Sequence, residues 1–273
     1  MQAKKIWAMY WSATETTKTV VTAVAGKMAD KLGLPLEEYD FTLPAARQGA
    51  PDFGPEDVVV FGTPTYAGRV PNVLLKYLAT VRGNGAAAVP VVTFGNRAFD
   101  DSLIELRDIL ADNGFRPFAA AAFACEHSFS TVLAAGRPDA DDLALAAQFA
   151  EQAAARVAAL DADTPVIAVP GRAKEDRDYY QPRDRAGNSI DIRKVKPKTN
   201  DQCDNCGICA AVCPMGSIDP QDVRQFTGIC IKCGACIKKC PRGAKYYDDP
   251  GYLYHKTELE EGYKRRAEVR LFV

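Results

Sequence analysis

The chain has 273 residues and a mass of 29.6 kDa, enough for one large domain or two modest ones. It is 47% hydrophobic, and 34 basic residues balance 35 acidic ones, which disfavours a strongly basic nucleic-acid-binding protein and an acidic disordered one. No apolar run reaches the roughly 18 residues that span a bilayer, and the first residues lack the long apolar core of a signal peptide. These features predict a soluble, cytoplasmic protein that binds neither nucleic acid nor membrane.

Short apolar runs alternate with helix-like segments over the first 160 residues. Runs without polar residues, such as Val58–Phe61, are typical of strands that are buried on both faces. Five strands are predicted, at residues 5–11, 34–41, 57–64, 88–95 and 118–125. Helices are predicted between and after them, at residues 16–32, 71–79, 102–113 and 139–160. This alternation is typical of an α/β fold with a doubly wound parallel sheet.

The composition changes after residue 160. Charged residues, Pro and Gly dominate a stretch of some 40 residues, which predicts a connector that lies along the surface. We therefore divide the chain into a first domain at 1–164, a connector at 165–198, a cysteine-bearing domain at 199–250 and a tail at 251–273. The tail is expected to pack on one of the domains, and the alternation in its last residues predicts a short strand.

Eight of the nine cysteines lie between Cys203 and Cys240, in two copies of the pattern C-x2-C-x2-C-x3-C-P. This is the motif of bacterial proteins with two [4Fe–4S] clusters, in which the last cysteine of each copy binds the cluster of the other copy. Two structural zinc ions are the alternative, although zinc sites usually show two separated cysteine pairs. The predicted ligands are Cys203, Cys206, Cys209 and Cys240 for cluster I, and Cys230, Cys233, Cys236 and Cys213 for cluster II.

The predicted first helix opens with a turn rich in hydroxyl groups. Backbone N–H groups and the helix dipole at such a position favour an anion. Neither the G-x-G-x-x-G pattern nor the Walker lysine pattern is present there, so a single phosphate fits better than a pyrophosphate. A plain helix cap is the alternative interpretation. The candidate residues are Ser12, Ala13, Thr14, Glu15, Thr16 and Thr17.

Two further loops follow the third and fourth predicted strands. In a doubly wound sheet, ligands bind outside the carboxyl ends of the strands, so these loops and the first turn should meet at one edge. They offer hydroxyl groups, glycines for close approach and aromatic rings for stacking on a flat ligand. The candidates are Pro64, Thr65, Tyr66, Ala67, Gly68, Thr93, Phe94, Gly95, Asn96, Arg97 and Phe99.

These residues resemble the flavodoxin family over about 1–160, and the cysteines resemble dicluster ferredoxins over about 199–247. Flavodoxins hold the FMN phosphate with a T/S-x-T-G-x-T loop: Ser12, Thr14 and Thr17 match its hydroxyl positions, and Glu15 stands where Gly is usual. The whole chain resembles the flavodoxin–ferredoxin fusion proteins of anaerobic prokaryotes, which also share the segments 95–97, 126–130 and 136–138. The resemblance implies a five-stranded sheet in the order 2-1-3-4-5, FMN in the three loops, and a smaller α+β domain with two [4Fe–4S] clusters.

The resemblance implies an electron-transfer protein that passes electrons between the two clusters and FMN, with low-potential redox proteins as partners. The alternatives are a flavin-dependent reductase of a small molecule, fed by its own clusters, and an iron–sulfur sensor without flavin. A capped flavin would favour the relay, and an open aromatic pocket would favour the reductase. The sequence leaves enzymatic activity and the oligomeric state open, a homodimer included.

Three residues near the expected site keep more than one interpretation, and for His127 these include contact with the cysteine-bearing domain. Arg69 and Arg97 would either stabilise an anionic reduced flavin or pair with carboxylates between the domains. His127, which follows the fifth predicted strand, would either act near the flavin or serve as a structural residue.

Overall fold

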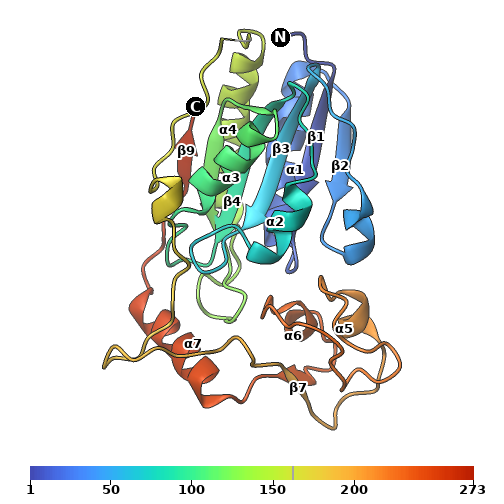
Figure 1. Ribbon diagram of the computed structural model, residues 1–273, viewed down its shortest axis with the longest axis vertical. Helices are drawn as coiled ribbons and strands as arrows, with labels where there is room; N and C mark the ends of the chain where they lie inside the picture. The colour runs from blue at the N-terminus through green and yellow to red at the C-terminus, as the bar shows by residue number, and fades with distance from the viewer. Residues whose placement is uncertain (162) are drawn as a thin grey trace.

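The computed structural model describes residues 1–161 and 163–273, and Figure 1 shows two parts, one below the other. The N-terminal part, residues 1–161, is a sheet with helices on both faces. The cysteine part, residues 198–249, lies beneath the lower ends of the strands. Ala162 falls inside the predicted first domain and is outside the described residues.

Five parallel strands form the sheet, in the order β2-β1-β3-β4-β6. When these five strands are numbered in chain order, β6 is the fifth, so the arrangement is the expected 2-1-3-4-5. This confirms the flavodoxin-like fold class. The strands are β1 (Lys5–Tyr10), β2 (Leu36–Asp40), β3 (Asp57–Pro64), β4 (Ala87–Phe94) and β6 (Ala120–Ala124). All residues of β4 and β6 are buried, as the apolar runs predict for central parallel strands.

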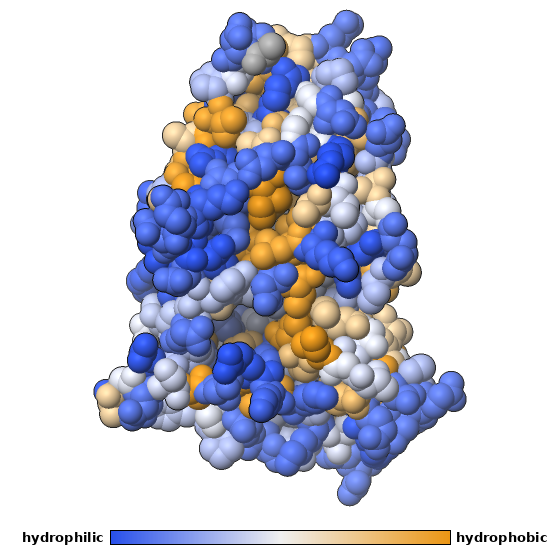
Figure 2. Space-filling model, viewed as in Figure 1, coloured by the Kyte–Doolittle hydropathy of each residue, from blue (hydrophilic) through white to orange (hydrophobic). Residues whose placement is uncertain are grey.

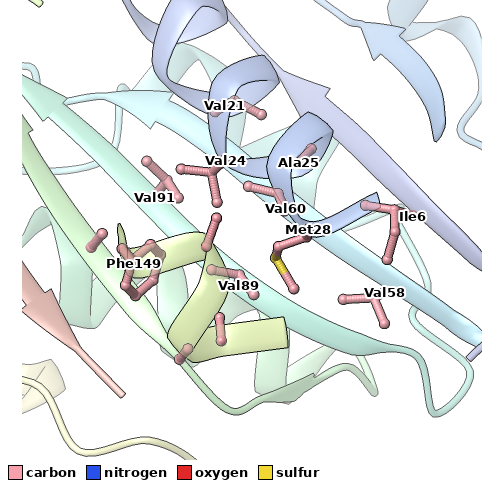
Figure 3. Close-up of a cluster of buried hydrophobic side chains, with 14 of the residues drawn as sticks. Ile6, Val21, Val24, Ala25, Met28, Val58, Val60, Val89, Val91 and Phe149 are labelled. Carbon is pink, nitrogen blue, oxygen red and sulfur yellow. The ribbon is translucent and has the colours of Figure 1, made fainter. Parts of the chain in front are cut away.

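Helices cover both faces of the sheet. On one face α1 (Thr16–Leu32) packs beside α4 (Ala140–Val157), and Val24, Met28 and Phe149 fill the space between these helices and the strands (Figure 3). The other face carries α2 (Asn72–Leu78) and α3 (Ser102–Asp112). A 3-10 turn, η1 (Pro44–Gln48), follows β2. The four predicted helices are therefore confirmed, with ends that differ by at most a few residues.

The fifth predicted strand is interrupted. Its first residues form β5 (Arg116–Pro117), in which Arg116 pairs with Ala87, whereas in β6 Ala121 pairs with Val91. From the first pair to the second there are four residues along β4 but five along the chain from β5 to β6. The segment from β5 to β6 therefore contains one extra residue, which is a β-bulge. Pro90 lies at this place in β4 and has no N–H to donate, so the ladder cannot continue without a break.

The last residues of the chain return to the N-terminal part. The tail strand that the sequence predicts is β9 (Arg270–Phe272), and it extends the sheet by pairing antiparallel with β6. The sheet therefore has more strands than the predicted five. Arg137 holds the same segment: its guanidinium donates two bonds to Asp142, at 2.8 and 2.6 Å, and one to the carbonyl of Ala267, at 2.8 Å.

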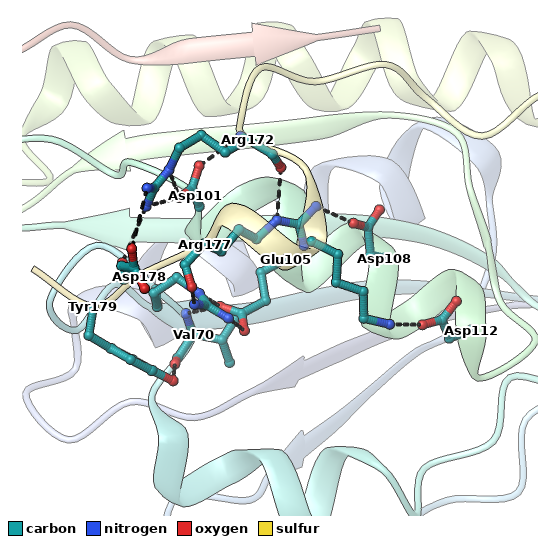
Figure 4. Close-up of polar contacts among 11 residues, drawn as sticks. Val70, Asp101, Glu105, Asp108, Asp112, Arg172, Arg177, Asp178 and Tyr179 are labelled. Carbon is teal, nitrogen blue, oxygen red and sulfur yellow. Dashed lines mark hydrogen bonds and ion pairs between the residues drawn. The ribbon is translucent and has the colours of Figure 1, made fainter.

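The connector, residues 163–197, runs along the N-terminal part (Figure 4). Two of its arginines pair with carboxylates of α3, one at the residue that precedes the helix and one within it. Arg172 pairs with Asp101 at 2.8 Å, and Arg177 pairs with Asp108 at 2.5 Å. A 3-10 turn, η2 (Lys174–Asp176), lies between the two arginines. These contacts fix the connector on the surface, as its composition suggested.

The cysteine part is built from two short halves. One contains α5 (Ile208–Ala211) and the other α6 (Ala235–Lys238), and the strands β7 (Lys198–Thr199) and β8 (Lys245–Tyr246) pair at its base. The helix α7 (Pro250–Gly262) then leads to the tail. Figure 2 shows a mainly hydrophilic face, with a band of hydrophobic side chains that continues toward the junction of the two parts. No helix within residues 1–161 or 163–273 is long and apolar enough to cross a membrane.

We expect Arg137→Met to lower the free energy of unfolding by about 3–5 kcal/mol, because it leaves the carboxylate of Asp142 buried without its main partner. That carboxylate is 1% exposed. Lys27→Met is the control, since it breaks a half-exposed pair with Glu151 and should cost less than about 1 kcal/mol. Urea unfolding of both variants measures the difference. Equal losses would contradict a role of Arg137 in anchoring the tail.

Candidate functional site

A pocket of about 440 Å³ opens where the carboxyl ends of the parallel strands meet; we call it the edge pocket. It is formed by the three predicted loops and by the segment after β6. Of the predicted candidates it is lined by Ala13, Thr14, Thr16, Thr17, Pro64, Thr65, Tyr66, Thr93, Phe94 and Gly95. The three predicted loops therefore lie together, because parallel strands deliver their carboxyl ends to one edge of the sheet.

Hydroxyl groups hold the walls of the edge pocket in place. Thr17, in the first turn of α1, shares a hydrogen bond of 2.7 Å with Thr93 at the end of β4. Thr65 similarly bonds Ser102 at 2.7 Å, which ties the loop after β3 to α3. The helix α1 begins at Thr16, so the amino end of a 17-residue helix faces the pocket. Its dipole favours an anionic ligand group there.

Two residues of the predicted phosphate loop have other roles. Ser12 is buried, and its hydroxyl oxygen accepts a bond of 3.0 Å from the N–H of Lys18 in the first turn of α1. Glu15 adopts a left-handed conformation with a φ of 70°, which costs about 1–2 kcal/mol for a residue with a Cβ. Its carboxylate pairs with Lys239 of the cysteine part and does not line the edge pocket.

Five further candidates lie outside the edge pocket because other segments occupy their polar groups. The carbonyls of Ala67 and Gly68 accept from the N–H groups of Tyr180 and Asp101, which join this turn to the connector and to α3. The amide of Asn96 donates to the carbonyls of Tyr263 and Arg265, each at 2.7 Å, and so holds the tail. The remaining two are Arg97, which pairs with Asp100, and Phe99, which packs against Phe94.

Arg69 also forms its ion pair within the N-terminal part. Its guanidinium binds both carboxylate oxygens of Glu105, at 2.8 and 2.5 Å. Both arginines that the sequence singled out thus pair with carboxylates of their own domain, not across the domain boundary.

The edge pocket has five lining residues that were not among the cofactor candidates: Trp11, Cys125, Glu126, His127 and Ser128. Trp11 directly follows β1. An aromatic residue at the carboxyl end of the first strand was the sequence signal that could have identified it as part of the site. Its indole N–H is fully buried and has no hydrogen-bond partner within residues 1–161 and 163–273. Such an unpaired donor is costly unless a ligand accepts from it.

His127 packs tightly against Gly95. A Cβ at position 95 would lie 2.1 Å from the His127 ring, so only glycine permits this approach. The N–H of Phe129 donates to Nδ1 of His127 at 3.0 Å, which leaves the proton of the neutral ring on Nε2. Burial, followed by the charge of Lys238, lowers the pKa of His127 to about 3. The ring is therefore a neutral group in the pocket wall.

The eight clustered cysteines surround two separate hollows. Hollow I, of about 300 Å³, is lined by the four thiols assigned to cluster I: Cys203, Cys206, Cys209 and Cys240. Hollow II, of about 340 Å³, is lined by the four assigned to cluster II: Cys213, Cys230, Cys233 and Cys236. The structure thus brings the cysteines together in the crossed pattern that the motif predicts.

Backbone N–H groups point at the sulfurs in both halves. The N–H of Ser217 donates to Sγ of Cys213 at 3.4 Å, and that of Ala244 donates to Sγ of Cys240 at 3.3 Å. Each donor lies four residues after its cysteine, so the two halves repeat the same geometry. Donors of this kind stabilise thiolates that bind an electron-rich core.

Hollow II lies directly against the edge pocket. Gly234 lines hollow II, and a Cβ on it would lie 2.4 Å from the carbonyl oxygen of Ser128 in the pocket wall. Lys238 donates to the carboxylate of Glu126 at 2.6 Å and to the carbonyl of His127 at 2.7 Å. Burial, followed by the charge of Cys233, raises the pKa of Tyr66 in the pocket wall well above its ordinary value.

Residues 202–246 match the family model of the 4Fe-4S dicluster domain. The match covers both cysteine motifs and identifies this segment as an iron–sulfur domain. No curated protein matches the chain significantly.

Several solved structures are similar to the N-terminal part. They include a flavodoxin from the domain Archaea, 12% identical with a TM-score of 0.39, covering 56% of this chain and 99% of that one. A flavodoxin from Streptococcus pneumonia TIGR4 is 21% identical with a TM-score of 0.37, covering 57% and 99%. Oxidised Flavodoxin 1 from Bacillus cereus is 16% identical with a TM-score of 0.40, covering 54% and 95%. The strand order carries the fold assignment: the chain joins a flavodoxin-like part to a 4Fe-4S domain.

We expect Gly95→Ala to destabilise the protein by about 1–3 kcal/mol, because its methyl group must displace the ring of His127. In a His127→Ala background the same substitution should cost much less, since the ring is gone. Denaturant unfolding of the two single variants and the double variant measures this coupling. Additive losses would show that Gly95 is needed for a reason other than contact with His127.

Proposed function

We propose that this protein transfers electrons between two [4Fe–4S] clusters and FMN within one chain. Cys203, Cys206, Cys209 and Cys240 would hold cluster I in hollow I. Cys213, Cys230, Cys233 and Cys236 would hold cluster II in hollow II. FMN would occupy the edge pocket; it supplies a centre that exchanges one or two electrons, whereas each cluster exchanges one.

The edge pocket fits FMN in two respects. The amino end of α1 and the hydroxyls of Thr14 and Thr16 suit the phosphate. Trp11 and Tyr66 supply aromatic surface, and the indole N–H of Trp11 is a buried donor without a protein partner in the described chain. A ring carbonyl of the flavin is the kind of acceptor that this donor requires.

The contact between hollow II and the edge pocket carries this proposal. Gly234 touches the carbonyl of Ser128, and Cys233 belongs to the same buried cluster as Trp11. Electron transfer becomes steeply slower with distance, so a cluster in hollow II would be the immediate redox neighbour of the flavin. Because one chain holds both sites, transfer would not wait for an encounter between two proteins.

The contact between the edge pocket and the cysteine part favours a relay over a small-molecule reductase. The ion pair Lys238–Glu126 and the close approach of Gly234 to Ser128 place the cysteine part against one wall of the pocket. A relay needs only contact with the next redox centre, which the packing at Gly234 supplies.

We further propose that an external redox protein exchanges electrons at hollow I. Cys206 is exposed, whereas Cys233 and Cys236 of hollow II are buried. The electron path would therefore connect partner, cluster I, cluster II and FMN in that order, in either direction.

The anaerobically purified protein should contain one FMN and about eight iron and eight sulfide ions per chain, as two [4Fe–4S] clusters require. Flavin analysis, iron and sulfide determination and electron paramagnetic resonance (EPR) during a reductive titration measure this. Cys125→Ala should keep all the iron, because Cys125 lies in the edge pocket and not in hollow I or II. Zinc in place of iron, or iron without flavin, would each overturn the proposal.

Gly234→Ala should slow electron transfer between the clusters and FMN at least several-fold, because its methyl group pushes against Ser128. Gly207→Ala is the matched control. Both glycines precede a four-residue helix, with φ values of 76° and 77°, so the backbone strain is the same. Only Gly207 has open space around its missing side chain.

Flash reduction of the clusters, followed by flavin absorbance, gives the transfer rate in each variant with full iron content. Equal rates in the two variants would contradict electron transfer across the contact at Gly234. A slower rate only in Gly234→Ala would support it.

A further inference from the structure

The two halves of the cysteine part differ in charge at one buried position. Ile218 lies five residues after Cys213 and lines hollow II, and Lys245 lies five residues after Cys240 and lines hollow I. The residues that precede them correspond as well: Pro214 to Pro241, and Ser217 to Ala244. The repeat thus places an apolar side chain beside one set of thiols and an ammonium group beside the other.

Lys245 is a buried cation with fixed partners. It is 3% exposed, like Ile218, so water does not screen its charge as it would at the surface. Its ammonium donates to the hydroxyl of Thr199 at 2.7 Å and to the carbonyl of Val223. These partners are neutral, so the full positive charge acts on its surroundings. On the side of hollow II, the ammonium faces the ring of Phe226, whose centre is 5.3 Å away.

We propose that Lys245 sets the order in which the two clusters accept electrons, by raising the reduction potential of cluster I above that of cluster II. The proposal rests on the two clusters of the proposed function. On reduction, one electron from an external donor enters the iron–sulfur core, no bond breaks, and the cluster becomes more negative by one charge. A buried cation stabilises the more negative form, and net charge is one of the factors that set cluster potentials.

The other charged and polar groups near the hollows act less directly on the reduction potentials of the clusters. Arg242 lines hollow I but is paired with Asp204 at 2.8 Å, so their charges offset each other. Lys232 stands in the loop of hollow II, but its side chain does not line the hollow, and it is partly exposed, so water screens its charge more than that of Lys245. The hydroxyl of Tyr247 approaches the Cys230 sulfur at 3.8 Å and carries no charge.

The test is an EPR-monitored potentiometric titration of the holoprotein and of Lys245→Gln. Glutamine removes the charge and keeps an amide that can donate to Thr199 and Val223. Lys198→Gln is the matched control, because Lys198 lies in the strand that pairs with β8 and its side chain is 62% exposed. We expect two reduction waves in the wild type and in Lys198→Gln. In Lys245→Gln, the higher wave should move to a more negative potential and approach the lower one.

The proposal is overturned if Lys245→Gln, with full iron content, leaves the higher wave in place or moves only the lower one. If this variant fails to bind iron, the order in which the two clusters of the wild type are reduced tests the proposal. In protein reduced by one electron, the shifted NMR signals of the cysteine β-protons should show the reduced state at Cys203, Cys206, Cys209 and Cys240. Signals of the reduced state at the other four cysteines would overturn the proposal.

The failures of the two proposals are distinguishable. If the purified protein does not contain two iron–sulfur clusters, both the proposed function and this inference fail. If it contains both clusters but the higher reduction potential does not depend on the charge at position 245, only this inference fails.

Discussion

The cysteine part is held to the N-terminal part at both of its ends, and the position of the two hollows relative to the edge pocket depends on this double attachment. Before it, the connector is fixed to α3 by Arg172 and Arg177. After it, the tail returns to the sheet as β9, and Asn96 and Arg137 bind its backbone. A segment fixed at both ends has little freedom left to lose on docking. Hollow II therefore remains beside the edge pocket.

Charge supports the same arrangement. The segment 1–164 carries more acidic than basic residues and the segment 165–273 the reverse, and the two signs meet at the junction. Lys238 and Lys239 lie between the last two cysteines of the second motif. Lys238 pairs with Glu126 in the wall of the edge pocket, and Lys239 pairs with Glu15 outside it. The basic excess of the second half thus serves contacts between the parts, and at Lys245 it reaches the interior beside the cysteines.

The sequence predicted most of the fold because the signals were local. Helix and strand periodicity, Gly114 after α3 and the cysteine spacing each depend on residues close together in the chain. The candidate site was predicted at the level of loops and only partly at the level of side chains. Asn96, Arg97 and Phe99 lie in a predicted loop, yet they contact the tail, Asp100 and Phe94. The tail carbonyls that bind Asn96 are 167 and 169 residues away, and the contacts of Arg97 and Phe99 depend on how the loop itself folds.

By itself, the sequence determined the parallel α/β sheet, the three loops at its carboxyl edge and the two crossed sets of cysteine thiols. Periodicity and ligand spacing encode these features within short stretches of chain. Only the tertiary structure decided that β9 completes the sheet, that hollow II and not hollow I faces the edge pocket, and that Trp11 and His127 form its walls. Each of these depends on packing between segments that lie up to the length of the chain apart, where local patterns carry no information.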